Sequence, residues 1–185
     1  MTDDELTLAL REHALLEGDF LLRSGRRSRY YLDKYRFETR PDLLAALGDR
    51  IAGAVAEFEP EATRLAGPEL GAVALAAAGS LASGLPFVIV RKAAKEYGTS
   101  NRLEGAYENG ELVCFVEDVV TSGGALLDAV SAVRDAGLIV HTAICVVDRE
   151  EGGMEALARE SVELRPIFRA SEIQDTPKSA AKPHG

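Results

Sequence analysis

Short strands made entirely of apolar residues alternate with helical patterns in the second half of this chain. Residues 87–90 (FVIV) and 112–116 (LVCFV) are uninterrupted apolar runs, whereas a strand with one face in water would alternate with polar residues. Further strands are predicted at 64–66, 139–147 and 162–168, the last at a sheet edge. Because strands that alternate with helices form parallel sheets with right-handed crossovers, the sequence predicts an α/β fold with a central, mostly parallel sheet flanked by helices.

The N-terminal part of the chain has a different pattern. Apolar residues at every fourth position predict a helix over residues 3–15. Residues 20–22 and 30–32 are predicted to form the two short strands of a small hairpin. A second helix is predicted to begin near Pro41 and to end before Pro60.

The length of the chain, 185 residues, suits a single domain with a substantial core. We expect this domain to cover residues 1–173. The remaining residues, 174–185 (QDTPKSAAKPHG), are polar and include prolines, so they are predicted to form a disordered tail.

The composition argues against two classes of partner and favours a cytoplasmic protein. A formal net charge of −9 argues against a surface that coats nucleic acid or an anionic membrane, although it leaves room for a local cationic pocket. The longest weakly apolar stretch, 72–90, is interrupted by serine, glycine and proline, so it is not predicted to span a membrane. The first residues are acidic, unlike a signal peptide. Cys114 and Cys145 lie in apolar runs typical of buried, reduced thiols.

The strongest chemical signal follows the strand at 112–116. Two adjacent carboxylates lead into a small turn that is rich in hydroxyls and glycine, after which a helix is predicted to begin. The segment runs Glu117, Asp118, Val119, Val120, Thr121, Ser122, Gly123, Gly124 and Ala125. Backbone N–H groups at such a helix start suit a phosphate monoester. The carboxylates, about a sugar's length away, suit the vicinal hydroxyls of a ribose at the ligand-binding edge of the sheet.

Two commoner phosphate-binding motifs are missing from the sequence. Without G-x-x-x-x-G-K-[ST] the chain has no nucleoside triphosphatase loop, and without G-x-G-x-x-G a dinucleotide site is not expected. The alternative interpretation is an ordinary strand–turn–helix corner with acidic residues in solvent. The order of two carboxylates, two hydroxyls and two glycines after a buried strand favours a binding site.

Residues 116–125 resemble the phosphoribosyl-diphosphate signature of the type I phosphoribosyltransferases. The resemblance covers about residues 6–170 and narrows to the orotate phosphoribosyltransferases, because three further motifs stand in the expected order. These motifs are F-x-L-x-S-G-x-x-S-x-Y-Y-x-D at 20–33, R-K-x-x-K-x-x-G at 91–98 followed by L-E-G at 103–105, and V-D-R-x-E-G at 147–152.

This resemblance implies a fold, a reaction and a cofactor. The fold would be that of the type I phosphoribosyltransferases, with a hood formed by about residues 1–38 and the C-terminal strand. The reaction would transfer the phosphoribosyl group of 5-phosphoribosyl 1-diphosphate to orotate, giving orotidine 5′-phosphate and pyrophosphate in pyrimidine biosynthesis. Asp118 and Glu117 would be catalytic groups that hold the ribose hydroxyls. Mg²⁺ would be carried by the substrate, because the sequence has no cluster dense enough in ligands for a dedicated metal cage.

A polar segment after the strand at 87–90 concentrates Arg91, Lys92 and Lys95 in an otherwise acidic chain. A charge run of this kind is often only a solvated turn. The resemblance implies instead that Lys95 stabilises the departing pyrophosphate. It also implies that Arg91 acts with Lys95 across a homodimer interface, and that Lys92 acts within its own subunit. A mobile loop here would close over the site and exclude water.

Orotate carries a carboxylate, so its site needs a cation. Arg149, at the end of a predicted strand, is the candidate, and an ion pair with Glu150 or Glu151 is the alternative role for its side chain. Thr121 is expected to touch the base as well. Tyr30 either packs in the hairpin core or stacks on the base.

The hairpin residues Arg23 and Ser24 are expected to cover the orotate. Many members of the family have lysine where Arg23 stands and histidine where Tyr97 stands. Some have a Tyr-Lys pair where this chain has Glu69-Leu70. A lysine contact to the diphosphate at that position therefore cannot be carried over, although backbone N–H groups there could still serve.

Two other functions stay open from the sequence. A purine phosphoribosyltransferase would share the fold, but a neutral purine needs no partner like Arg149. A regulatory protein that binds the diphosphate without turnover would typically lose the loop lysine, and Lys95 is present.

Overall fold

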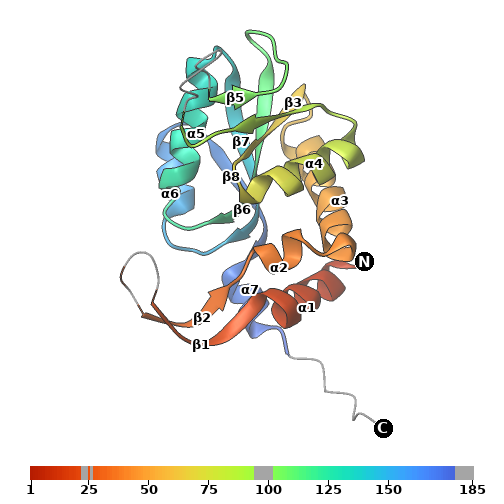
Figure 1. Cartoon of the computed structure of the whole chain (residues 1–185), viewed down its shortest axis with the longest axis vertical. Helices are drawn as coiled ribbons and strands as arrows, with labels where there is room; N and C mark the ends of the chain where they lie inside the picture. Colours follow the sequence, from red (N-terminus) through yellow and green to blue (C-terminus); the bar gives the residue numbers. More distant parts are fainter. Residues whose placement is uncertain (22–24, 26, 94–101, 178–185) are drawn as a thin grey trace.

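The computed structural model describes residues 1–21, 25, 27–93 and 102–177. These residues form a six-stranded sheet with helices on both faces and a separate two-stranded sheet (Figure 1). The helices are α1 (Asp3–Ala14), α2 (Tyr35–Glu38), α3 (Pro41–Phe58), α4 (Gly71–Ser83), α5 (Gly124–Asp135), α6 (Gly153–Arg159) and α7 (Ala170–Asp175). The strands are β1 (Leu15–Leu21), β2 (Arg27–Leu32), β3 (Arg64–Pro68), β4 (Phe87–Val90), β5 (Leu103–Glu104), β6 (Leu112–Val120), β7 (Ile139–Asp148) and β8 (Glu163–Arg169).

The large sheet has the strand order β5-β4-β3-β6-β7-β8. All neighbouring pairs in it are parallel except β4 and β5, which confirms the predicted α/β fold. From β3 the chain crosses to β4 on one side, and later returns to β6 on the other side. Such a reversal opens a crevice at the carboxyl ends of the two strands, and ligands of open α/β sheets bind there.

Each face of the sheet buries its own apolar cluster. Cys114 and Val116 of β6 pack in the cluster that includes α3 and α4. Val113 and Phe115 pack in the cluster that includes α5 and α6. Side chains alternate along a strand, so one strand fills both cores. Cys145 lies in the second cluster, on the opposite face from Cys114, and both thiols are free and buried, as predicted.

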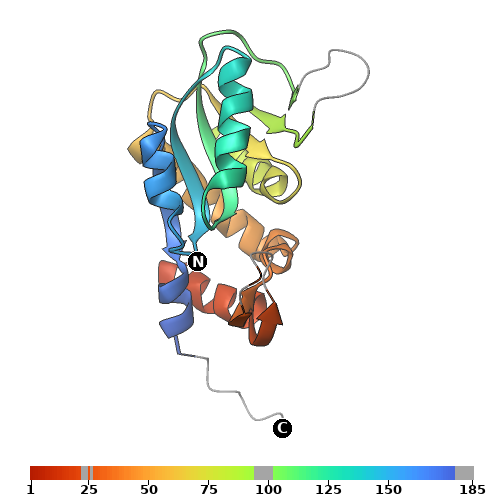
Figure 2. The same cartoon turned by 90° about the vertical axis from the view of Figure 1, so that its left-hand side faces the viewer.

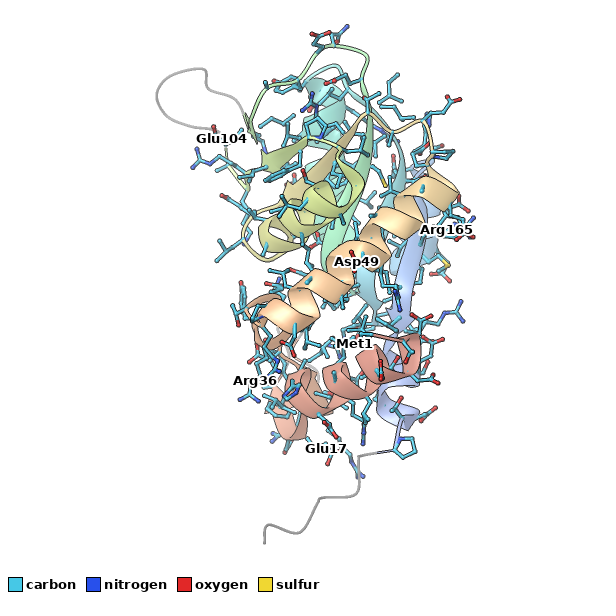
Figure 3. The ribbon with its side chains drawn as sticks, turned by 90° about the vertical axis from the view of Figure 1, so that its right-hand side faces the viewer. Met1, Glu17, Arg36, Asp49, Glu104 and Arg165 are labelled. Atoms are coloured by element: carbon cyan, nitrogen blue, oxygen red, sulfur yellow. The ribbon has the colours of Figure 1, made fainter. Side chains whose placement is uncertain are left out.

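A smaller unit lies beside the carboxyl ends of the large sheet, and we call it the hood. It consists of α1, the antiparallel pair β1–β2, α2 and α7 (Figure 2). Arg50 of α3 joins the start of α1 to the main body, because its Nε lies 2.6 Å from Asp3 Oδ1 and its Nη2 donates to the carbonyl of Met1 at 2.8 Å. Figure 3 shows α3, labelled at Asp49, crossing between the sheet and this part of the hood.

The C-terminal contribution to the hood differs from the prediction. The last strand, β8, belongs to the large sheet, where it pairs with β7 as the edge strand. The element that packs on α1 is the helix α7, whose Ala170 and Ile173 are buried at 5% and 1% exposure. The helix continues to Asp175, so the predicted tail boundary at 174 was two residues too early.

Two other local predictions need correction. The hairpin strands are longer than predicted. Strand β1 already begins at Leu15, directly after α1. Strand β6 also continues past Val116 to Val120, because Val119 and Val120 stay in register with Val147 and Asp148 of β7. Among the described residues, no helix has both the length and the apolar character needed to cross a membrane.

Candidate active site

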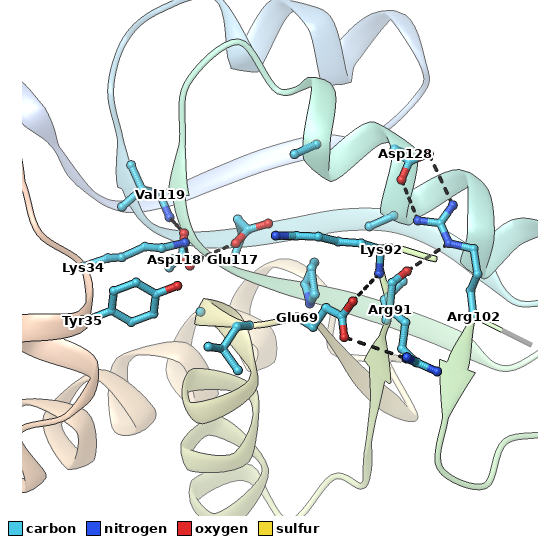
Figure 4. Close-up of a pocket in the computed structure, with 16 residues that line it drawn as sticks. Lys34, Tyr35, Glu69, Arg91, Lys92, Arg102, Glu117, Asp118, Val119 and Asp128 are labelled. Carbon is cyan, nitrogen blue, oxygen red and sulfur yellow. Dashed lines mark hydrogen bonds and ion pairs between the residues drawn. The ribbon is translucent and has the colours of Figure 1, made fainter. Parts of the chain in front are cut away.

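A cavity of about 400 Å³ lies at the crevice between the ends of β3 and β6. Six parts of the chain line it: the β3–α4 turn, the end of β4 with the residues after it, Arg102 before β5, the end of β6, the first turns of α5, and the start of α2 from the hood (Figure 4). Glu117 and Asp118 both line this cavity, so the structure places the two predicted carboxylates at the ligand-binding edge of the sheet.

The two carboxylates lie within β6 and differ in their surroundings. The Asp118 side chain is 4% exposed, and both of its oxygens have donors. Lys34 Nζ lies 2.5 Å from Oδ2, and the N–H of Val119 donates to Oδ1 at 2.5 Å. Glu117 is only half-buried, and its Oε1 accepts a hydrogen bond from the N–H of Asp118 at 2.9 Å. Asp118 is therefore anchored, while Glu117 faces the cavity more openly.

Gly71, the first residue of α4, makes the close approach to Asp118 possible. A Cβ at this position would collide with Asp118 Oδ2 and would lie 2.8 Å from Lys34 Nζ. The carboxylate and the ammonium thus occupy the space that a side chain would fill.

Burial and the neighbouring charge of Asp118 raise the pKa of Glu117 to about 8. The charge of Lys34 opposes this rise. At neutral pH, Glu117 is therefore largely protonated.

The predicted phosphate turn leads directly into α5. Gly123 precedes the helix with φ of 80°, a left-handed conformation that favours glycine. No side chain caps the helix start, so its first N–H groups remain available to an anion. A small hollow at this turn is lined by Thr121, Gly123 and Ala125, and it shares Glu117 and Val119 with the large cavity. Thr121 and Ser122 are exposed. A phosphate at the turn would thus be continuous with a sugar at the carboxylates.

The opposite end of the cavity gathers three cations, Arg91, Lys92 and Arg102, together with carboxylates that pair with them. Arg91 lies between two carboxylates, with Nε 3.9 Å from Glu69 Oε2 and Nη1 3.7 Å from Glu104 Oε1. The N–H of Lys92 donates to Glu69 Oε1 at 2.7 Å, and in Figure 4 the Lys92 side chain extends toward Glu117. Arg102 donates from Nε to the carbonyl of Arg91 at 2.9 Å.

Arg149 lies outside the residues that line the large cavity. Its guanidinium stacks over the ring of Tyr30, 5.2 Å from the centroid, and pairs with Glu151 at 3.2 Å. Its side chain is 10% exposed, and Nε is buried without a hydrogen-bond partner. The ion pair with Glu151 that was considered from the sequence is therefore present. Tyr30, which belongs to the hairpin, packs against Arg149.

Three predicted site residues, Arg23, Ser24 and Lys95, lie outside the described residues. Conversely, sequence reasoning missed Lys34, Glu69 and Arg102 as parts of the site. The short segment DKYRFE at 33–38 gave too brief a helical pattern to be recognised. It is the helix α2 that places Lys34 against Asp118.

The strand order, the carboxylate pair on β6 and the uncapped helix start after it together define the class of type I phosphoribosyltransferases. No family model matches the chain. Individual relatives of known function do match the chain, over most of its length. The chain is 50% identical to the orotate phosphoribosyltransferase of Methanocella arvoryzae over 92% of this chain and 97% of the relative. It is 51% identical to that of Halobacterium salinarum over 93% of this chain and 97% of the relative.

Solved structures give the same result. The orotate phosphoribosyltransferase of Aeropyrum pernix matches with a TM-score of 0.83 at 32% identity, over 92% of this chain and 96% of that one. The Mycobacterium tuberculosis orotate phosphoribosyltransferase in complex with 5-phospho-α-D-ribosyl 1-diphosphate matches with a TM-score of 0.79 at 30% identity, over 93% of this chain and 98% of that one. The chain belongs to the orotate phosphoribosyltransferase family, whose members are pentosyltransferases.

Proposed function

We propose that this cleft transfers the phosphoribosyl group of 5-phosphoribosyl 1-diphosphate to N1 of orotate. The bond from the anomeric carbon to pyrophosphate breaks, N1 of orotate gives up its proton to solvent and bonds to that carbon with inversion, and the products are orotidine 5′-phosphate, pyrophosphate and a proton. One observation carries the proposal. The carboxylates Glu117 and Asp118 lie between an uncapped helix start and a cluster of cations, in hollows that join. Phosphate, ribose and diphosphate follow each other in that order along the substrate.

The ribose is assigned to the carboxylates. Carboxylate oxygens accept hydrogen bonds from vicinal hydroxyls, and their negative charge favours the positive charge that develops at the anomeric carbon. The 5′-phosphate is assigned to the turn from Thr121 to Ala125, where the uncapped N–H groups of α5 begin and Thr121 and Gly123 line a small hollow. The hydroxyls of Thr121 and Ser122 would add donors.

The diphosphate is assigned to Arg91, Lys92 and Lys95. Among the described residues, no three His, Cys, Asp or Glu side chains are placed to hold a metal ion. Mg²⁺ prefers phosphate oxygens and water, so we assign it to the substrate's own diphosphate, where it supplies further positive charge. The cations of the protein then stabilise the negative charge of the leaving group.

Orotate is assigned to Arg149, with Thr121 beside it and the hairpin residues Arg23 and Ser24 above. A guanidinium binds a carboxylate through two parallel hydrogen bonds. The unpartnered Nε of Arg149 is one such donor, and stacking on Tyr30 holds the plane of the group.

We further propose that the working unit is a homodimer in the cytoplasm. The segment from Arg91 to Lys95 would reach the site of the partner subunit, with Lys92 serving its own site. Mixed dimers of Lys95→Ala with Asp118→Asn would then contain one intact site and recover part of the activity. The absence of recovery would contradict a shared site. Two free, buried thiols suit a reducing compartment.

A turnover assay with a panel of bases tests the proposed reaction. The protein is offered 5-phosphoribosyl 1-diphosphate and Mg²⁺ with orotate, uracil, adenine, guanine, hypoxanthine or xanthine in separate reactions. Consumption of orotate alone supports the proposal. Turnover of a purine would overturn the roles of Arg149 and the hairpin, and binding of the diphosphate without turnover of any base would favour a regulatory protein.

A further inference from the structure

The short helix α2 brings two charged side chains to Asp118. Lys34 immediately precedes the helix and Glu38 ends it, four residues later, so the two side chains lie on the same side of one helical turn. Neither residue belongs to the motifs that identified the site. Both approach the carboxylate from the hood, whereas Asp118 comes from the sheet.

Contacts with several neighbouring groups fix the position of the Lys34 side chain. Its ammonium lies 2.5 Å from Asp118 Oδ2 and 5.4 Å from the centroid of the Tyr35 ring. The missing side chain of Gly71 leaves it room. A lysine on the surface gains little from an ion pair because water competes. Here the lysine is 33% exposed but its partner carboxylate is only 4% exposed, so water competes for one side of the pair only.

Glu38 is a buried acid that the proposed reaction does not use. It is 4% exposed, and its Oε1 has no hydrogen-bond partner among the described atoms. Burial, followed by the charge of Asp118, raises the pKa of Glu38 to about 8, while Lys34 opposes the rise and Asp33 adds to it. At neutral pH, Glu38 therefore holds a proton.

We propose, on the basis of the function proposed above, that Lys34 and Glu38 are positioning residues of the ribose site. Lys34 fixes Asp118 through Oδ2, and Glu38 is the buried acid of the same helix that completes the cluster. Each carboxylate oxygen has a second lone pair, so Asp118 can still accept a ribose hydroxyl. The arrangement also limits negative charge where a highly anionic substrate must bind.

Replacement of Lys34 by methionine tests the first half of this proposal. Lys34→Met keeps the length of the side chain and removes its charge. Orotidine 5′-phosphate, which contains the ribose, should bind about tenfold to hundredfold more weakly, as expected when a charge-assisted hydrogen bond is lost. Pyrophosphate, which lacks the ribose, should bind as before. Both affinities come from calorimetric titration, so they are measurable even if the wild-type protein turns over no base.

Activity against pH gives a readout that a merely structural role would not move. Lys34 lowers the pKa of Glu117, so its loss should shift the acid limb of kcat/KM upward by about one pH unit or more. Lys34→Gln, which can still donate to Oδ2, serves as a second variant if Lys34→Met does not fold. The matched control is Arg36→Met, which removes a cation from the same helix that is 53% exposed and pairs with Asp33. Equal losses for orotidine 5′-phosphate and pyrophosphate, or a pH profile that does not move, would overturn the role of Lys34.

Replacement of Glu38 by glutamine tests the second half. The amide resembles the protonated acid, so activity at pH 7 should stay within about threefold of the wild type. The raised pKa of Glu38 means that the folded wild type binds a proton that the unfolded chain has lost between pH 4.5 and about 8. The stability of the wild type relative to Glu38→Gln should therefore fall as the pH rises through that window, and level off above it. A loss of activity at pH 7 as large as that of Lys34→Met, or a stability difference independent of pH, would contradict the role of Glu38.

Discussion

The two ends of the cleft are built in different ways. At the sugar end, the Asp118 side chain is 4% exposed and its ion pair with Lys34 is 2.5 Å long. At the diphosphate end, the pairs of Arg91 with Glu69 and Glu104 are 3.9 and 3.7 Å long, and the side chains involved are 32–35% exposed. At the sugar end a buried carboxylate forms a short pair with a lysine that is 33% exposed. At the diphosphate end the pairs of Arg91 are longer and exposed on both sides, although Arg102 pairs with Asp128 at 2.6 Å.

This difference matches the fates of the two parts of the substrate. The ribose stays through the reaction, and its acceptors gain from being fixed before it arrives, because preorganised groups need no rearrangement at the transition state. The diphosphate must bind and then leave. Cations that form only long, exposed ion pairs can exchange a protein carboxylate for the diphosphate at a small cost in free energy. The comparison predicts large effects for changes at the sugar end and small effects for changes to the diphosphate-end carboxylates.

The largest effect is expected for Asp118→Asn. The amide keeps the shape but removes the charge that accepts the hydroxyl and favours the cationic transition state. We expect kcat/KM to fall by about hundredfold or more, as for other groups that stabilise developing charge. Steady-state kinetics measure the loss, and a fall of less than about fivefold would mean that the sugar end is not preorganised for catalysis. Glu111→Gln is the matched control, because this carboxylate pairs with Arg64 away from the cleft and its variant should retain turnover.

A smaller but still large effect is expected for Arg149→Ala. Loss of a charged hydrogen-bond donor to the orotate carboxylate should raise the KM for orotate about tenfold to hundredfold. The KM for 5-phosphoribosyl 1-diphosphate should stay near that of the wild type. If both KM values rise together, Arg149 supports the cleft as a whole and does not recognise the base.

The pH dependence of kcat/KM tests the role of Glu117, the half-buried carboxylate at the sugar end. The pKa of Glu117 is raised to about 8, so its ionised, hydroxyl-accepting form grows as the pH rises toward that value. The kcat/KM of the wild type should therefore increase with pH up to about 8. Glu117→Gln should be slower and should lose this limb of the profile. A wild-type profile that is flat between pH 6 and 8 would contradict the assignment.

The smallest effect, and one of opposite sign, is expected for Glu69→Gln at the diphosphate end. The carboxylate of Glu69 lies among the cations that the diphosphate needs, so its neutralisation should lower the KM for 5-phosphoribosyl 1-diphosphate by about twofold to fivefold. Pyrophosphate should also inhibit more strongly. A weaker affinity would show that Glu69 supports the cation cluster and does not compete with the substrate.

The large sheet and the phosphate turn were predictable because their signals are local and strong. Uniformly apolar runs such as 87–90 identify buried strands, and the order of carboxylates, hydroxyls and glycines marks the turn after β6. The helix predicted to begin near Pro41 begins there, and the helix predicted after the turn begins at Gly124. The carboxylates were placed just after the strand, whereas pairing with β7 keeps them inside it.

The hood was less predictable because its elements are short and depend on tertiary contacts. Helix α2 covers only Tyr35–Glu38, too little for a periodic pattern, and α7 is fixed by the burial of Ile173 against α1. The contact of Lys34 with Asp118 joins residues 84 positions apart in the sequence. No local sequence pattern signals such a pair, so the contribution of Lys34 to the sugar end could be recognised only from the structure.

A crossed titration tests most directly whether the two ends of the cleft have separate tasks. Orotidine 5′-phosphate and pyrophosphate are titrated separately into the wild type, Asp118→Asn and Lys92→Met. Asp118→Asn should weaken the binding of orotidine 5′-phosphate and spare pyrophosphate, and Lys92→Met should do the reverse. If each variant weakens both ligands to the same extent, the cleft is not divided into a sugar end and a diphosphate end.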